Sequence, residues 1–433
     1  MRAGDMPDCH DVLGVGFGPA NLALAIAFAE DLPDVTTRFL EAQHDPVWQG
    51  GMMLDGVNVQ NHPSRDLVTL RNPRSRYSFL NYLFEQGRLV EHLNLPVEFP
   101  LRKEYAQYIR WATAQFAHVA RFGTRVAEIA ADTWRGQPVH VVRTHDGGEE
   151  LARTLVVGTG RTPYVPEQFA SAVRSPRVFH LTEYLQRVRE LSEPRRIAVI
   201  GGSQSAVEIT LDLARRFPGA RVVDYVRAFG LRLKDTSPFS EEGYFPEFTE
   251  YYFNASRTGK RALDAYMRPT NYSSTDDDVL KELYLLIYEQ RLDGDQRVFV
   301  RGNREVRAAT VRDDSVLLEV EEVHTGVVET DEVDAVVLAT GFRDLGPGPG
   351  QEPYPALLSG IADRFRFDDD GYLEVNADYS VTPVHPATAP LYLNGLCEST
   401  HGIGDAGSFS LLSLRAVAIR DGVRKHLGEK GKT

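Results

Sequence analysis

The 433-residue chain has few cysteines, no long apolar run and a shortage of positive charge. Cys9 and Cys397 are its only cysteines, too few and too far apart for a disulfide framework, a cysteine zinc site or a redox-active pair. No stretch of about 20 apolar residues could cross a bilayer. The opening residues "MRAGDMPDCH" also lack the apolar core of a signal peptide. We therefore expect no membrane partner, no metal site and a cytoplasmic location.

The formal charge of −13 argues against nucleic acid as a partner, because a phosphate backbone favours a basic surface. A local basic site for a phosphate or a carboxylate is still compatible with this charge. At about 150 residues per domain, the length predicts two or three domains.

A glycine-rich segment near the N-terminus, "HDVLGVGFGPANLALAIAFAE", has the pattern of strand, turn and helix. Gly14, Gly16 and Gly18 allow a tight turn and a close approach to a pyrophosphate, which the start of the helix attracts. Pro19 replaces the usual third glycine and is tolerated in a first helical turn. Glu41 ends the next strand, where an acid would bind ribose hydroxyls. The alternative is a structural turn with no nucleotide.

A second segment of this kind is "RRIAVIGGSQSAVEITLDLARRFPGARVVDYVR". Gly201 and Ala206 fill the first and third fingerprint positions, whereas Ser203 stands where the second glycine is usual. The following strand ends in Arg227, which suits a 2′-phosphate and therefore NADPH over NADH. The alternative for Arg227 is a solvated surface arginine.

Two more apolar runs, "LVVGTGRTP" and "DAVVLATGFRD", stop at a Thr-Gly pair, where a strand could meet a cofactor. Thr340 and Gly341 form the second of these pairs. The pattern predicts an α/β fold with two Rossmann-like dinucleotide-binding domains, an FAD domain with an inserted NADPH domain, plus a small, mainly helical substrate-binding region. The predicted boundaries are 1–165 and 340–433 for the FAD domain, 166–232 and 291–339 for the NADPH domain, and 233–290 for the helical region.

Read together, "GVGFGPANLALAIA", "RDLVTLRNPRSRYSFLNYL", "GGSQSAVE", "NYSSTDDDV", "VLATGF" and "THGIG" resemble the flavin-dependent amine N-hydroxylases. This is the family of the ornithine and lysine N-monooxygenases of siderophore synthesis. The resemblance covers nearly the whole chain and implies an enzyme that uses FAD, NADPH and O2. In such a family the nitrogen of an uncharged substrate amine attacks a flavin C4a-hydroperoxide, so the cofactor carries the difficult chemistry.

The resemblance also implies roles for single residues. Gln60 matches the glutamine beside the flavin, and Asn271 matches the asparagine that holds the reacting amine. Each could instead be a capping or core amide. His401 is expected next to the flavin, but could equally be a structural hydrogen-bond donor. We also include Trp48 and Ser205 among the candidate cofactor-binding residues.

The segment "VQNHPSRDLVT" differs from the "MQVSFLKDLAT" that is typical of the ornithine enzymes. Arg65 falls on their substrate-binding lysine, and His62 lies in the altered stretch. Glu241 stands about where they carry an asparagine, and Arg415 about where they carry a serine. Because an arginine grips a carboxylate through two hydrogen bonds, two arginines and a histidine favour L-aspartate, which would be oxidised towards N-hydroxyaspartate and nitrosuccinate.

Other substrates and classes stay open. Glu241 opposes α-amine chemistry because a nearby carboxylate favours the ammonium form, unless an arginine neutralises it or it lies outside the pocket. L-Ornithine or L-lysine is the main alternative, and a diamine would leave Arg65 without a carboxylate. A disulfide reductase would need two nearby cysteines, and the segment "TNYS" favours an amine enzyme over one that oxidises carbonyl or sulfur compounds. A non-catalytic flavin or NADPH sensor is compatible with Ser203 and Pro19. We expect a homo-oligomer.

Overall fold

The computed structural model describes residues 9–45 and 47–430, and its first sheet is built around one buried parallel strand. Strand β1 (Cys9–Val15) lies between β2 (Thr37–Leu40) and β6 (Glu149–Val157), parallel to both. Val12, Leu13 and Val15 are buried, as expected for a parallel strand covered on both faces. The strand order is β3-β2-β1-β6-β5-β4, and β15 also pairs with β6.

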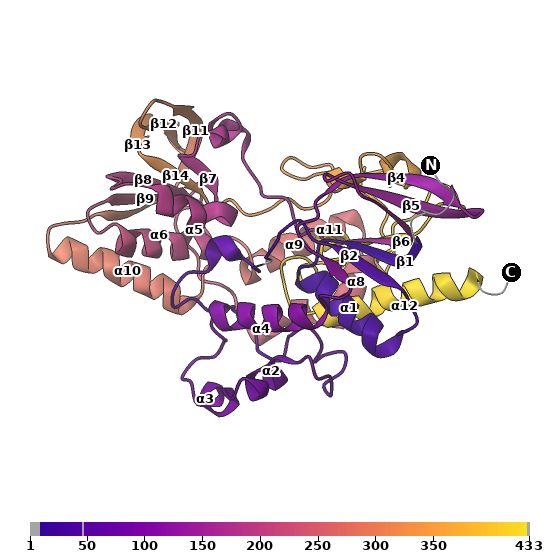
Figure 1. Cartoon of the computed structure of the whole chain (residues 1–433). Coiled ribbons are helices and arrows are strands. Elements are labelled where there is room, and N and C mark those ends of the chain that lie inside the picture. The colour runs from indigo at the N-terminus through magenta and orange to yellow at the C-terminus, as the bar shows by residue number, and fades with distance from the viewer. Residues whose placement is uncertain (1–8, 46, 431–433) are drawn as a thin grey trace.

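The remaining elements of this first unit have the following bounds. The strands are β3 (Ala120–Arg121), β4 (Val126–Trp134), β5 (Gln137–Thr144) and β15 (Leu391–Leu393). The helices are α1 (Pro19–Asp31), α2 (Phe79–Glu85), α3 (Leu89–Leu93), α4 (Arg102–Gln115), α11 (Glu398–His401) and α12 (Leu412–Lys430). Helices α1 and α12 lie side by side although they are far apart in sequence (Figure 1).

A second parallel sheet has the order β10-β9-β8-β14-β7. Its strands are β7 (Val178–His180), β8 (Arg196–Ile200), β9 (Arg221–Tyr225), β10 (Val298–Arg301) and β14 (Ala335–Leu338), and α5 (Tyr184–Arg187) follows β7. Helix α6 (Gln204–Arg216) covers one face. The antiparallel strands β11 (Arg304–Val311), β12 (Val316–Glu322) and β13 (Val328–Val333) share a core with the other face.

The chain leaves the first sheet after β6, builds the second sheet between residues 178 and 338, and returns through β15. Leu391 of β15 pairs with Leu155 of β6, so the return is built into the sheet itself. A crossover of this length is what two nested parallel sheets require. The predicted fold class, an α/β chain with two Rossmann-like units and added helices, is confirmed.

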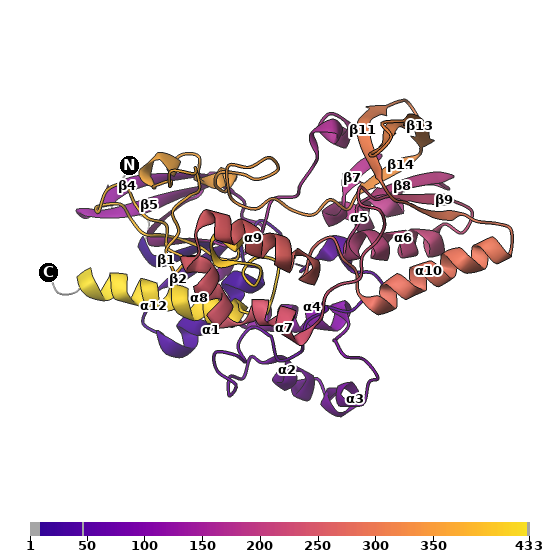
Figure 2. The same cartoon turned by 180° about the vertical axis from the view of Figure 1, so that it is seen from behind.

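The segment between the two halves of the second unit is helical, but its helices pack on different partners. It contains α7 (Pro238–Glu241), α8 (Pro246–Asn254), α9 (Arg257–Met267) and α10 (Asp277–Leu292). Helix α8 contacts α11 of the first unit. Leu283 and Ile287 of α10 instead pack on Val207 and Leu211 of α6. Figure 2 shows α10 alongside the second unit, so packing places it there and not with the helical region predicted at 233–290.

No helix within the described residues is long and apolar enough to cross a membrane.

Candidate active site

The first glycine turn joins β1 to α1 as the sequence predicts. Gly16 has φ +85°, and a Cβ atom there would lie 2.6 Å from the carbonyl oxygen of Gly158, so only glycine fits. Gly14 is packed against Phe39, whereas a Cβ at Gly18 would have no neighbour within 4 Å. Pro19 is the first residue of α1. The turn is therefore closed towards the sheet and open at Gly18, where the helix start can receive a phosphate.

Glu41 follows β2 and lies beside this turn. Its Oε2 accepts the backbone N–H of Phe17 at 2.8 Å, and its Oε1 accepts that of Gln43, also at 2.8 Å. The carboxylate therefore ties the turn to the end of the second strand. An acid in this place fits a ribose, as predicted, and it also holds the shape of the turn.

The second turn joins β8 to α6. Gly201 is packed against the carbonyl oxygen of Ala339, and Ala206 is buried in the core beneath the turn. Ser203 is the N-cap residue of the helix and has extended backbone angles, but its side chain makes no capping hydrogen bond. Ser203 and Ser205 both line the cavity described below. Arg227 lies just beyond β9 with 77% of its side chain exposed, where an incoming phosphate can reach it.

A cavity of about 480 Å³ lies between the two units. Its wall includes the second glycine turn, the loops that follow β2 in the first unit and the helical segment, whereas the first glycine turn does not line it. Among the predicted residues, the wall includes Trp48, Gln60, Arg65, Ser203, Ser205, Glu241, Asn271 and Gly341. The structure thus brings together residues that are more than 200 positions apart in sequence.

Gln60 lies on this wall and carries a buried side-chain atom without a hydrogen-bond partner among the described residues. Its backbone has φ +51°, a conformation that non-glycine residues adopt rarely, and its N–H donates to Oδ1 of Asn58. The Nε2 atom is buried and has no hydrogen-bond partner within the described part of the chain. A buried amide donor without a partner costs free energy, and a cofactor with acceptor atoms would remove that cost. The site therefore fits a flavin ring.

Arg65 and Glu241 form an ion pair on the cavity wall. Nη1 of Arg65 lies 3.5 Å from Oε2 of Glu241 and 3.3 Å from Oγ of Ser410. The two charged side chains are 28% and 30% exposed, so they face the cavity and remain accessible. The guanidinium also lies 6.0 Å from the centre of the Tyr244 ring. The pair presents one positive and one negative group to a bound molecule.

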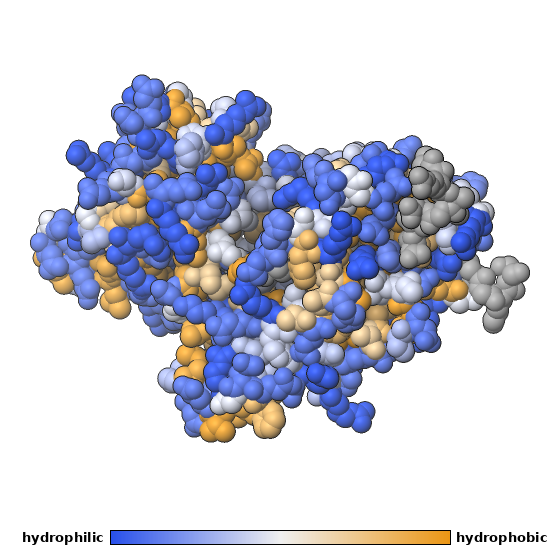
Figure 3. Space-filling model, viewed as in Figure 1, coloured by the Kyte–Doolittle hydropathy of each residue, from blue (hydrophilic) through white to orange (hydrophobic). Residues whose placement is uncertain are grey.

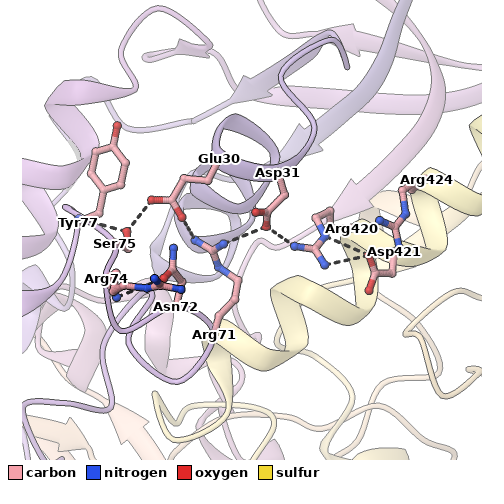
Figure 4. A network of polar contacts seen from close by, with 10 residues as sticks. All are labelled: Glu30, Asp31, Arg71, Asn72, Arg74, Ser75, Tyr77, Arg420, Asp421 and Arg424. Carbon is pink, nitrogen blue, oxygen red and sulfur yellow. Dashed lines mark hydrogen bonds and ion pairs between the residues drawn. The ribbon is translucent and has the colours of Figure 1, made fainter.

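The loop that carries Arg65 is held from several sides. Asp66 accepts the backbone N–H groups of Val68, Thr69 and Phe79. Burial raises the pKa of Asp66, and these hydrogen bonds partly offset that rise. Further along the loop, Arg71 pairs with Glu30 and Asp31 of α1. Figure 4 shows that Asp31 in turn meets Arg420 of α12, so both helices anchor the loop.

Next to Asn271 lies a buried polar cluster that the sequence analysis did not assign. Arg161 Nη1 donates to the hydroxyl of Tyr272 at 2.9 Å and to Oδ1 of Asp344 at 3.1 Å. The Tyr272 hydroxyl donates to Oε2 of Glu398 at 2.6 Å. Burial raises the pKa of Glu398 to about 8, although Arg161 opposes this rise. Both Arg161 and Glu398 stand beside quoted motifs, in "GTGRTP" and "ESTHGIG", and that position was the available signal.

Three residues predicted to contact the flavin or the substrate, His62, His401 and Arg415, lie elsewhere. His62 is exposed and bonds to Ser64. His401 is buried and stacks on Tyr379 with ring centres 4.0 Å apart, and burial lowers its pKa to about 4. None of the three lines the cavity. The place of His401 next to the flavin stays a prediction, because the first glycine turn does not line this cavity either.

Arg415 is the third predicted residue that does not line the cavity. Its guanidinium is buried and donates to Oδ1 of Asp405 at 2.8 Å and to Oδ1 of Asn394 at 2.8 Å. An arginine whose hydrogen bonds are taken by buried partners is unable to grip a substrate carboxylate as well. Thr340 does not line the cavity either, and its hydroxyl donates to the carbonyl oxygen of Tyr164. Neighbouring Gly341, with φ +76°, does reach the cavity wall.

Comparison with known proteins agrees with this site. Residues 8–344 match the model of the L-lysine 6-monooxygenase/L-ornithine 5-monooxygenase family. The chain belongs to this family. It is 36% identical to the L-ornithine N(5)-monooxygenase of Burkholderia cepacia, over 98% of this chain and 96% of that protein. The prediction of an N-hydroxylating monooxygenase is confirmed.

Solved structures of the family have the same fold throughout. The ornithine hydroxylase of Pseudomonas aeruginosa superposes with a TM-score of 0.88 at 33% identity, covering 97% of this chain and 100% of that one. An ornithine N-hydroxylase from Kutzneria, solved with reduced FAD, NADP+ and L-ornithine, gives 0.89 at 32% identity with the same coverage. The aspartate preference inferred from sequence gains no support from these relatives.

Proposed function

We propose that this enzyme uses FAD, NADPH and O2 to hydroxylate the side-chain amine of L-ornithine or L-lysine. The observation that carries the proposal is the ion pair of Arg65 and Glu241 on the cavity wall. A free amino acid has a carboxylate and an ammonium group on one carbon atom. Arg65 suits the first and Glu241 suits the second, so the pair matches the α-carbon end of such a substrate.

This arrangement also explains which nitrogen is oxidised. Glu241 stabilises the protonated form of an amine beside it, and an ammonium ion has no lone pair with which to attack oxygen. The α-amine is thereby protected. The distal amine extends to the part of the cavity lined by Gln60 and Asn271, where it can be held in its neutral form. The position of the acid, which counted against α-amine chemistry, becomes an argument for side-chain chemistry.

Aspartate is less well matched to this cavity. Its second carboxylate needs a further cation, but His62 and Arg415 do not line the wall. The other cations of the wall are already paired: Arg102 with Glu208, Arg161 with Asp344, and Lys234 with Asp276. Two carboxylates would thus compete for Arg65 and meet the negative charge of Glu241.

The residues that would hold the cofactors follow from the two turns. Gly14, Gly16, Gly18, Pro19 and Glu41 would hold the dinucleotide of FAD, with Gln60 and Trp48 beside its ring. Gly201, Ser203, Ser205, Ala206 and Arg227 would hold NADPH. When bound, the reduced flavin supplies the activated oxygen atom. The chain itself binds the substrate, orients the amine and keeps water out of the cavity.

We also propose that the enzyme is a homo-oligomer. Exposed apolar side chains gather on and around α2 and α3, on the underside of the molecule in Figure 3. They are Leu80, Phe84, Val90, Leu93, Leu95 and Val97. A contiguous patch of this kind supports an interface with a second copy. Analytical ultracentrifugation should give more than one chain per particle, and Phe84→Glu should shift it towards the monomer.

The substrate proposal is tested with purified protein, NADPH and a panel of L-ornithine, L-lysine, L-aspartate and putrescine. Arg65→Ala should raise the apparent KM for the preferred amino acid by about 10–100-fold, which is the effect of losing a hydrogen-bonded charge. The KM of Arg65→Lys should lie between those of the wild type and Arg65→Ala. An unchanged KM in Arg65→Ala would remove Arg65 from the substrate site. Oxidation of aspartate alone would replace the proposed substrate and leave the N-hydroxylase assignment intact.

A further inference from the structure

A buried ion pair joins the two units at the edge of the cavity. Arg102 begins α4, and Glu208 lies in α6. Nη1 and Nη2 of Arg102 donate to the two carboxylate oxygens of Glu208, each at 3.0 Å. The side chains are only 9% and 2% exposed. Two parallel hydrogen bonds between a planar guanidinium and a carboxylate fix orientation as well as distance.

Arg102 joins α4 of the first unit to the second unit at two points. Its Nη1 also donates to the carbonyl oxygen of Met52 at 2.7 Å, and the side chain of Met52 packs in the core of the second sheet. One and two helical turns further along α4, Tyr105 and Tyr108 are fully buried in the core of the first sheet. A rotation of the second unit against the first would therefore disturb the bonds of Arg102 to both Glu208 and Met52.

On the other side, Glu208 is connected to the loop that carries Asn271. Its Oε1 accepts Nε2 of Gln204 at 3.1 Å, and Oε1 of Gln204 accepts the backbone N–H of Asp276 at 2.9 Å. The N–H of Gln204 donates to the carbonyl oxygen of Ser274 at 3.0 Å. Gln204 stands between Ser203 and Ser205, in the turn expected to bind NADPH. One chain of contacts thus links α4, the second glycine turn and the loop after Asn271.

We infer that Glu208 is a positioning residue that couples the second dinucleotide turn to the Asn271 loop and to the first unit. It does not line the cavity, so it acts through Arg102 and Gln204. The coupling follows from burial, because a charge that loses its partner in this place is left uncompensated. Binding of NADP+ at the turn and order in the loop should therefore strengthen each other. This inference depends on the cofactors of the family and not on the proposed amino acid.

The test compares Glu208→Gln with Glu282→Gln. Glu282 of α10 pairs with Arg215 of α6, with both side chains at least half exposed, so the control loses the same charge from a surface pair. Three properties are measured on FAD-loaded enzyme without any amine: the Kd of NADP+, hydrogen exchange over residues 268–276, and the rate of hydrogen peroxide release at saturating NADPH. Flavin content and circular dichroism confirm that each variant is folded.

For Glu208→Gln we expect a Kd for NADP+ raised at least fivefold, faster exchange over residues 268–276 and faster release of hydrogen peroxide. Glu282→Gln should resemble the wild type. Gln204→Ala, which cuts the link to Asp276 but leaves Arg102 paired, should reproduce the faster exchange, and it decides the question if Glu208→Gln does not fold. Folded Glu208→Gln with exchange and Kd within twofold of the wild type would overturn the inference. Because no amine is present, a wrong substrate would not affect this result.

Discussion

The two glycine turns share a strand, turn and helix, but they are held in different ways. The first is tied to its own sheet, since Gly16 fits only against Gly158 and Glu41 accepts two backbone N–H groups. The second is tied to its neighbours, through the side chain of Gln204. A self-contained turn suits a cofactor that stays bound. A turn whose contacts extend to the other unit suits a cofactor whose binding must affect the conformation of that unit.

The largest expected effect comes from Gly16→Ala. The added methyl group would lie 2.6 Å from the carbonyl oxygen of Gly158, at a φ of +85° that alanine avoids. We expect purified protein without bound flavin, measured by the ratio of absorbance at the flavin and protein bands. Gly136→Ala is the control, because Gly136 has a similar positive φ of +78° but lies in the turn between β4 and β5, where a Cβ has open space. Normal flavin content in Gly16→Ala would show that the first turn is not a rigid site.

A somewhat smaller effect on cofactor binding is expected from a change at Arg227, the exposed residue beyond β9 in the second unit. Arg227→Ala removes a partner for the 2′-phosphate, so the preference for NADPH over NADH should fall about 10–100-fold. The melting temperature should stay unchanged, since 77% of the side chain is exposed. Steady-state KM values for both nucleotides measure the effect. An equal loss for NADH and NADPH would mean that Arg227 does not contact the 2′-phosphate.

Glu41→Gln should weaken flavin retention by about tenfold. An amide offers one acceptor oxygen where the carboxylate accepts two N–H groups, so the turn would keep one unsatisfied donor, a cost of about 1–3 kcal/mol. Flavin release during dialysis measures this effect. Retention equal to that of the wild type would show that Glu41 contributes to neither the turn nor the ribose.

The smallest effect concerns stability and again separates the two units. Asp224 of β9 is fully buried, and neither carboxylate oxygen has a hydrogen-bond partner among the described residues. Burial raises its pKa well above the ordinary value. The folded state keeps the proton while the unfolded state loses it above about pH 4, so stability falls as pH rises, by at most about 1.4 kcal/mol per pH unit.

Asp224→Asn removes this titration. Urea midpoints should therefore be higher for the variant than for the wild type at pH 8 and should converge as pH falls towards 4. A difference that is the same at both pH values would contradict a protonated Asp224. The first sheet offers a comparison in His140, which burial keeps neutral by lowering its pKa to about 4, although there backbone carbonyls accept from the ring.

The sequence predicted most of what depends on neighbouring residues. Strands β1 and β8 and both turns could be located because apolar runs, glycines and helix starts are local features. Arg65, Glu241, Gln60 and Asn271 meet in one cavity as the resemblance implied. These positions were reached through whole-chain similarity and not through spacing alone.

The predictions of site residues that failed depended on contacts that the local sequence does not reveal. Arg415 was assigned to the substrate, but Asp405 and Asn394 enclose it, and the pattern of its own helix carries no sign of them. The ion pair of Arg65 with Glu241 joins residues 176 positions apart, and our proposal of a basic amino acid in place of aspartate rests on it.

The most direct test of the central claim is the mass and the site of oxidation of the product formed from L-ornithine or L-lysine by the purified enzyme with NADPH and O2. We predict a product heavier by one oxygen atom, carried on the side-chain nitrogen, with little peroxide released. Oxygen on the α-nitrogen, or peroxide as the only product with both amino acids, would contradict the account.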